Sequence, residues 1–169
     1  MSGQKVETLL SDTQNSLKST TELCNNIANT EDLPPVFKEV EKCVCLVQEI
    51  LQVGQDQLQT GTLDIEDEEL LADLKNSKKE ALHLNGIFKV IAPPSETTPA
   101  QRYQEVVRKR SKDRVEDILL KLLEGINRLV TKDLIAASDE QASTLGEVME
   151  EVKGSGSEGK EEGKGAGNT

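Results

Sequence analysis

Val115-Glu-Asp-Ile-Leu-Leu-Lys-Leu-Leu-Glu-Gly-Ile-Asn-Arg-Leu-Val130 is the stretch of this sequence that decides the fold. Eight of its aliphatic residues follow one another at steps of 3, 1, 3, 1, 3, 3 and 1. Because an α-helix turns through about 100° per residue, only a helix places all eight on one face. We therefore predict a strongly amphipathic helix whose apolar face forms the centre of the core. The eight residues are Val115, Ile118, Leu119, Leu122, Leu123, Ile126, Leu129 and Val130.

The composition of the whole chain also favours helices. Hydrophobic residues make up 35% and charged residues 30% of the 169 residues, and the only aromatic residues are Phe37, Phe88 and Tyr103. Strands favour aromatic and β-branched residues, whereas Leu, Glu, Lys, Gln and Ala favour helices. A chain of this length suits one domain. We therefore predict an all-α fold, a four- to five-helix bundle over residues 1–152.

Helix-start signals and apolar spacing divide this domain into helices. Thr98 with Gln101, and Ser138 with Gln141, have the spacing of a capping box, in which each side chain accepts a hydrogen bond from the other residue's backbone N–H. Gly86 lies inside the third expected helix, which indicates either a closely packed neighbour or a bend. The expected helices cover residues 4–28, 34–58, 66–91, 99–132 and 138–152. The side of the third helix expected to be buried comprises Leu70, Leu71, Leu74, Leu82, Ile87, Phe88 and Ile91.

The last residues differ sharply in composition from the rest of the chain. After Lys153 the sequence is GSGSEGKEEGKGAGNT, which has no apolar residue larger than Ala. Such a segment cannot bury enough surface to offset its ordering entropy, so we predict a flexible tail over residues 153–169. Gly154 to Lys160 matches the spacing of a phosphate-binding loop, but Glu161 follows where Ser or Thr would bind Mg²⁺. No apolar strand precedes the match, so we interpret it as accidental.

Charge and cysteine content limit the class of protein. The net charge is −11 and the isoelectric point is near 4.7, which disfavours general binding to nucleic acid. No run of 18 apolar residues is present, and the N-terminal residues lack the apolar core of a secretory signal. The chain has an odd number of cysteines, Cys24, Cys43 and Cys45, and we expect them to be reduced thiols. We expect a cytoplasmic protein.

Residue patterns that would carry catalysis or bind metals are weak. Cys43 and Cys45 are two residues apart on an expected helix, so their side chains diverge, and His83 is the only histidine. The acids from Asp64 to Glu69 are typical of a helix N-terminus. We therefore expect no catalytic residue, no metal site, no cofactor and no small-molecule substrate.

One basic segment stands out in this acidic chain. Its cations lie within thirteen residues that carry only two acids, Glu105 and Asp113. The segment is either a solvated helix surface that pairs with the acidic third helix, or a docking patch for an acidic partner or an anionic lipid surface. Nucleic acid is disfavoured because no aromatic residue beyond Tyr103 interleaves the cations. The candidate patch comprises Arg102, Arg108, Lys109, Arg110, Lys112 and Arg114.

Four short motifs occur in a familiar order. They are Leu33-Pro-Pro-Val-Phe37, Lys78-Lys-Glu-Ala-Leu-His-Leu-Asn-Gly-Ile-Phe88, Arg102-Tyr103 and Val115-Glu-Asp-Ile-Leu119. Over about residues 6–150 the series resembles the SesA-type domain found at the N-terminus of fungal NACHT and other P-loop NTPases. Those NTPases are the fungal counterparts of NOD-like receptors.

The resemblance implies a helical bundle that acts as a non-catalytic signalling or effector module. Such a module would relay or execute a response to non-self, including regulated cell death, by associating with a NACHT-type receptor or with itself. The chain would be a stand-alone domain or the head of a larger protein. Two alternatives stay open, a general helical adaptor and an effector that acts on a membrane surface.

Overall fold

The chain folds as a bundle of α-helices in the computed structural model, which describes residues 2–27, 33, 36–93, 96–109 and 114–168. Side chains of residues 2, 3 and 155–168 are not described. No strand occurs among the described residues, so the predicted all-α class is confirmed. The helices are α1 (Ser2–Asn25), α2 (Phe37–Thr60), α3 (Glu68–Ile91), α4 (Pro99–Lys109), α5 (Val115–Thr131) and α6 (Asp139–Asn168).

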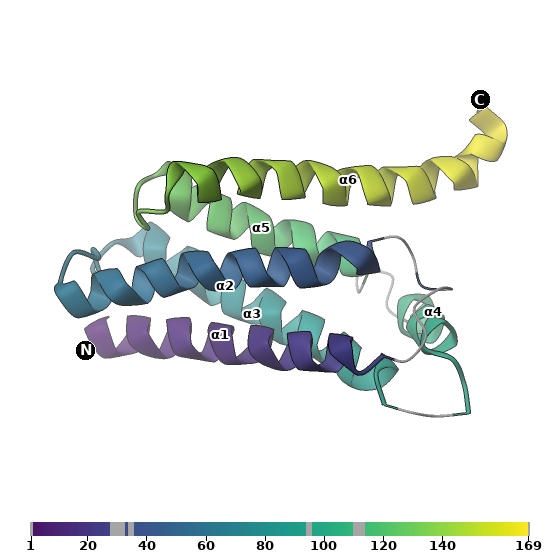
Figure 1. Cartoon of the computed structure of the whole chain (residues 1–169), viewed down its shortest axis with the longest axis horizontal. Helices are drawn as coiled ribbons and strands as arrows, with labels where there is room; N and C mark the ends of the chain where they lie inside the picture. Colours follow the sequence, from purple (N-terminus) through teal and green to yellow (C-terminus); the bar gives the residue numbers. More distant parts are fainter. Residues whose placement is uncertain (1, 28–32, 34–35, 94–95, 110–113, 169) are drawn as a thin grey trace.

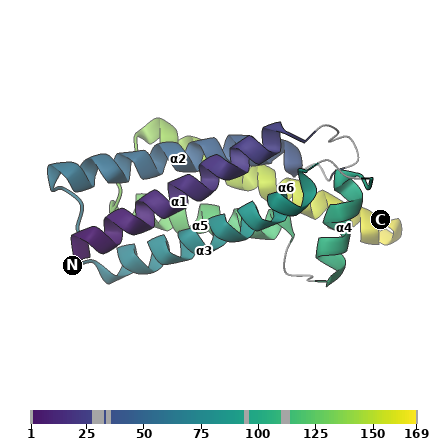
Figure 2. The same ribbon diagram turned by 90° about the horizontal axis from the view of Figure 1, so that it is seen from below.

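Five long helices alternate in direction, and the short helix α4 lies across one end of them (Figure 1). Helix α1 packs against α2 and α3, while α5 packs against α2, α3 and α6. Helix α6 also contacts α2, and α4 packs on α3. The view from below shows α4 crossing the end of the bundle where α3 finishes (Figure 2). This crosswise helix brings the side of α4 against the end of α3.

The core is centred on α5, as the spacing of its aliphatic residues predicts. All eight residues of that stripe are buried. They are joined in the core by Leu10 and Leu17 of α1, Ile50 of α2, and Leu74 and Phe88 of α3. Each buried aliphatic side chain contributes about 1.5–3 kcal/mol of transfer free energy, so this stripe outweighs any single polar contact described below.

Side-chain caps fix the starts of three helices. The Thr98 and Gln101 side chains each accept a hydrogen bond from the other's backbone N–H, at 3.1 Å and 2.9 Å. The Ser138 and Gln141 pair does the same, with both distances 3.0 Å. Both predicted capping boxes are therefore confirmed. Helix α3 starts after Asp67, whose carboxylate accepts a hydrogen bond from the Leu70 N–H at 3.0 Å.

The predicted helix over residues 99–132 is wrong, because the chain forms α4 and α5 there instead. Arg114 has extended backbone angles, φ −75° and ψ 136°, at the start of α5. The Val115 N–H that a continuous helix would bond internally donates instead to the Tyr103 hydroxyl, at 2.9 Å. No proline or glycine marks this break, so the sequence gives no local stop signal.

The expectation that Leu82 of α3 lies in the core is also wrong, because its side chain is 50% exposed, and one of the two alternatives for Gly86 is excluded. At Gly86, a Cβ atom built on the backbone would meet nothing within 4 Å, so no neighbouring helix packs closely there. Both residues face the space beside α4 rather than the core.

Helix α6 continues to Asn168, well beyond the end expected near Val152. Leu145, Val148 and Val152 are its buried side chains among the described residues. The last of them coincides with the end that the sequence indicates for the packed domain. The division into a 1–152 bundle and a flexible tail over 153–169 stays a prediction.

Candidate functional site

Arg102, the first cation of the candidate patch, fastens α4 to the end of α3. Its Nε atom donates to the Val90 carbonyl at 3.0 Å, and its Nη2 atom donates to the Ile91 carbonyl at 2.6 Å and the Pro93 carbonyl at 2.8 Å. Nη1 donates to the Thr97 hydroxyl at 3.1 Å. The last carbonyls of a helix lack partners within the helix, and a planar guanidinium can satisfy several of them. Arg102 therefore has a structural role in holding α4.

Two further cations of the patch lie on the exposed side of α4. The Arg108 Nη1 atom lies 3.0 Å from a carboxylate oxygen of Glu105, and both side chains are largely exposed. Such a surface pair contributes little to stability. Lys109 is also exposed, and it lines a groove between α3 and α4. These two residues remain accessible to a partner.

The remaining members of the patch are dispersed. Arg114 lies at the start of α5, 4.0 Å from Glu116, so it belongs to a different helix. Arg110 and Lys112 lie outside the described residues. The patch is therefore not one continuous helical surface, because the break between α4 and α5 divides it.

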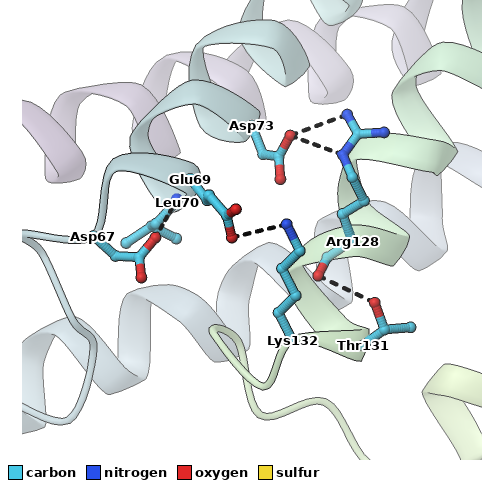
Figure 3. A network of polar contacts seen from close by, with 7 residues as sticks. All are labelled: Asp67, Glu69, Leu70, Asp73, Arg128, Thr131 and Lys132. Atoms are coloured by element: carbon cyan, nitrogen blue, oxygen red, sulfur yellow. Dashed lines mark hydrogen bonds and ion pairs between the residues drawn. The ribbon is translucent and has the colours of Figure 1, made fainter.

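Acids in the first turns of α3 pair with Arg128 of α5 and with Lys132, which follows the last residue of α5 (Figure 3). The Asp73 carboxylate accepts from Arg128 through Nη2 at 3.0 Å and Nε at 3.1 Å, and Glu69 lies 2.8 Å from the Lys132 ammonium. Among the described residues, the cations that pair with the start of α3 therefore come from α5 and the residue that follows it rather than from the basic segment. This network fixes the packing of α3 on α5.

All three aromatic residues of the chain meet where α4 crosses the bundle. The Phe37 ring lies 5.6 Å from the Phe88 ring and 4.9 Å from the Tyr103 ring, the second pair being edge to face. Such pairs add about 0.5–1.5 kcal/mol beyond their buried area. Burial raises the pKa of Tyr103 to about 12, so its hydroxyl stays protonated at neutral pH, and the hydroxyl oxygen accepts a hydrogen bond from the Val115 N–H. The cluster joins α2, α3, α4 and the start of α5.

An apolar groove of about 360 Å³ runs between α3 and α4 beside this cluster. Leu82 and Val90, which are 50% and 49% exposed, are the large hydrophobic residues that the described part of the chain exposes. Both lie in the groove, and with Gly86 they form a row at spacings of four along α3. The lining residues are Leu82, His83, Gly86, Ile87, Val90, Val106 and Lys109.

The edges of this groove carry positive charge. Lys79 and Lys89 are exposed on α3, within one helical turn of Leu82 and Gly86 respectively. Lys109 lines the groove from α4, and Arg108 and Lys109 also line an adjoining hollow of about 570 Å³. The groove therefore combines exposed apolar side chains with a basic edge, in a chain whose net charge is −11.

The sequence contains a signal for this groove that a search for one apolar face misses. Leu82, Gly86 and Val90 form a second row of α3, rotated away from the buried row that contains Leu84, Phe88 and Ile91. The prediction that Leu82 lies in the core leaves this second, exposed row unrecognised. Val106 of α4 completes the groove only because α4 folds back across α3.

The described part of the chain offers little for a metal site, a reactive thiol or a membrane span. No group of three His, Cys, Asp or Glu residues there could hold a metal ion. Burial, followed by the charge of Glu39, raises the pKa of the Cys43 thiol to about 12, which suppresses the reactive thiolate. Among the helices searched, none has an apolar stretch sufficient to cross a bilayer.

Comparison with known proteins identifies a family. The family model described as SesA, an N-terminal domain on NACHT NTPases and P-loop NTPases, matches residues 10–129. No curated protein and no solved structure gives a significant match. The matched range contains most of α1, the groove and the aromatic cluster, and it ends before α6.

Proposed function

The chain belongs to the SesA family of N-terminal domains on NACHT NTPases and P-loop NTPases, and on this premise we propose that it is a non-catalytic signalling module that acts by binding a protein. The match over residues 10–129 is the observation that carries the proposal. A non-catalytic module of this kind would act through contact with another molecule.

The groove between α3 and α4 supplies a surface suited to such contact. Exposed apolar residues that gather in one place commonly mark interaction sites, whereas scattered ones need no explanation. Leu82 and Val90 gather in this way and lie inside the region that the family shares. The partner is a NACHT-type receptor or another SesA-type domain, and the response is a cytoplasmic one to non-self, with cell death as its outcome.

A mixing experiment tests the proposal. The purified chain is combined with a NACHT NTPase from the same organism, with and without ATP, and the masses are measured by light scattering after size-exclusion chromatography. A complex of defined stoichiometry supports a receptor module. If the receptor and the chain elute separately under both conditions, and enforced clustering of the chain in cells triggers no loss of viability, the proposal fails.

The second candidate function is that of an adaptor unrelated to NACHT proteins, and the same mixing experiment distinguishes it from a receptor module. An adaptor would form a stable complex with another protein while leaving the NACHT NTPase unbound. Its expression in clustered form would then leave cell viability unchanged.

A further inference from the structure

We propose that the groove between α3 and α4 binds an acidic amphipathic helix of a partner protein. This inference rests on the proposed function, because it names the class of partner that the signalling module would recognise. The apolar row of α3, the basic edges of the groove and the fixed position of α4 carry it.

The apolar row has the length and shape that a partner helix requires. Leu82 and Val90 are eight residues apart, which spans about 12 Å along a helix at 1.5 Å per residue. A helix that presents apolar side chains at positions i, i+3, i+4 and i+7 covers about the same distance. Gly86 lies midway and has open space above it, so the centre of the row is a depression that can accept one large side chain.

The charge around the row selects an acidic partner. Lys79 and Lys89 are exposed within one helical turn of the row on α3, and Lys109 lines the groove from α4. Glu105, the acid that lines the adjoining hollow, pairs with Arg108, so these two charges cancel and the net charge beside the row is positive. Opposite charges across an interface increase the rate of association and exclude wrong partners. An acidic helix therefore matches both the apolar row and its edges.

The same charges disfavour the other occupants. A symmetric dimer through this groove would bring two basic edges together, because the same patch faces itself across a two-fold axis. Residues 153–169 contain no apolar side chain larger than Ala and cannot fill the row. Nucleic acid would need stacking partners, and Phe37, Phe88 and Tyr103 are all buried.

The walls of the groove are held in place before any partner arrives. Arg102 binds the last carbonyls of α3, and Tyr103 binds the start of α5 and packs on Phe37. Val106 and Lys109, one and two turns further along α4, are therefore fixed relative to α3. A preformed groove reduces the entropy lost on binding.

Fluorescence anisotropy with a synthetic peptide tests the inference on the full chain. The probe is a labelled helical peptide with Leu at i, i+3, i+4 and i+7 and mainly Glu on its other positions. The first control peptide has the same composition in scrambled order, and the second has Lys in place of Glu. We expect the chain to bind the first peptide at least about tenfold more tightly than either control.

Matched variants locate the binding. Val90→Glu and Leu82→Glu introduce an acid into the apolar row, and we expect each to weaken binding at least about tenfold. Ala72→Glu adds the same group at an exposed position of α3 outside the groove and should leave the affinity unchanged. Lys109→Glu should weaken binding, whereas Lys121→Glu, an exposed position of α5, should not. Circular dichroism verifies folding, and the surface lysine variants keep the test valid if Val90→Glu unfolds.

Several outcomes overturn the inference. Equal affinity for the scrambled peptide, or an equal loss in Ala72→Glu, removes the groove as the site. If the chain forms a dimer and Val90→Glu dissociates it, the groove is occupied by a second copy of the chain. If the chain binds vesicles that contain phosphatidylserine but not the peptide, and Lys109→Glu abolishes the vesicle binding, the target is a membrane. If the NACHT complex forms but the peptide does not bind, the proposed function stands and this inference fails.

Discussion

Gly54 of α2 and Gly86 of α3 are both inside helices, but their surroundings differ. A Cβ atom at Gly86 would meet nothing within 4 Å, whereas one at Gly54 would come within 3.1 Å of the Ile135 Cδ1 atom. Alanine is favoured over glycine in a helix by about 1 kcal/mol. We therefore expect Gly86→Ala to raise the free energy of unfolding by about 1 kcal/mol in urea titrations followed by circular dichroism.

Gly54→Ala is the matched comparison for that substitution. The gain in helix propensity is the same, but the added methyl group crowds Ile135 in the core, so we expect no gain or a loss of stability. Equal stabilisation by both substitutions would contradict this account, because it would mean that the surroundings of the two glycines do not matter.

The cysteines should differ widely in reactivity towards iodoacetamide at mildly alkaline pH. Cys45 is exposed, although burial of its thiol and the charges of Glu41 and Glu49 raise its pKa. Cys43 is buried and its pKa is raised to about 12. Because the thiolate is the reactive form, we expect Cys45 to be modified slowly and Cys43 only after unfolding.

Peptide mapping by mass spectrometry over a time course measures this order. Urea is the control, since it should make all three cysteines react at similar rates. Modification of Cys43 as fast as Cys45 in native buffer would show that the segment around it opens readily.

Arg102 fixes the position of α4 relative to α3. Arg102→Lys keeps the positive charge but loses the planar fork that reaches several carbonyls at the end of α3. We expect a loss of about 1–2 kcal/mol in stability, since a hydrogen bond from a charged group is worth about 1.5–3 kcal/mol and the lysine keeps part of the interaction. Hydrogen exchange should also become faster in residues 99–109 while α1 is unchanged.

Arg108→Lys is the control for that substitution. Arg108 forms an exposed pair with Glu105, so its replacement should change stability by less than about 0.5 kcal/mol. If both variants behave alike, Arg102 does not clamp α4 and belongs with the accessible cations of the candidate patch.

The contact between α2 and α6 should give a measurable pH dependence. Burial and a hydrogen bond with Glu151 raise the pKa of Glu39 above its ordinary value of 4.5. A raised carboxyl pKa means that the folded state favours the protonated group, so stability from this group is present at low pH and is lost as pH rises through its folded pKa. Gln resembles the protonated form, and Glu39→Gln should therefore raise the melting temperature at pH 7.

The effect should shrink as the pH falls through the raised pKa of Glu39, because Glu39 itself is then protonated. Thermal unfolding at several pH values measures it, with Glu41→Gln as the control at an exposed position of the same helix. A melting temperature that Glu39→Gln lowers at pH 7 would mean that the attraction of Glu39 to Lys42 outweighs burial and the proximity of Glu151.

Helix α6 lies outside the region that the family model matches, because the match ends at residue 129. Leu145, Val148 and Val152 of α6 are buried against the bundle. Burial of three such side chains is worth roughly 5–9 kcal/mol before ordering costs. We expect a chain ending at residue 137 to lose several kcal/mol of stability in urea and to self-associate in sedimentation velocity.

A chain ending at residue 153 is the matched control for that truncation. It keeps Leu145, Val148 and Val152, the buried side chains of α6 among the described residues, and removes only the Gly-, Lys- and Glu-rich segment, so its stability should equal that of the full chain. A large loss in the shorter deletion would place part of the fold in residues 154–169 and contradict the predicted boundary.

The helices, their caps and the core could largely be predicted from the sequence, because those features depend on local spacing. The α5 stripe and both capping boxes are examples. The break before α5 could not, since it depends on the Tyr103 hydroxyl meeting the Val115 N–H. The groove depends in turn on that break. The candidate site was therefore only partly visible, through Lys109 and Arg108 rather than through Leu82 and Val90.

The aromatic cluster also has an optical consequence. The chain has no tryptophan and only one tyrosine, and that tyrosine lies at the junction of α2, α3, α4 and α5. The intrinsic ultraviolet fluorescence of the protein therefore comes from a single known position next to the groove. Movement of α4 changes the environment of that fluorophore directly. The tyrosine fluorescence of the unlabelled protein therefore reports on the position of α4 at this junction.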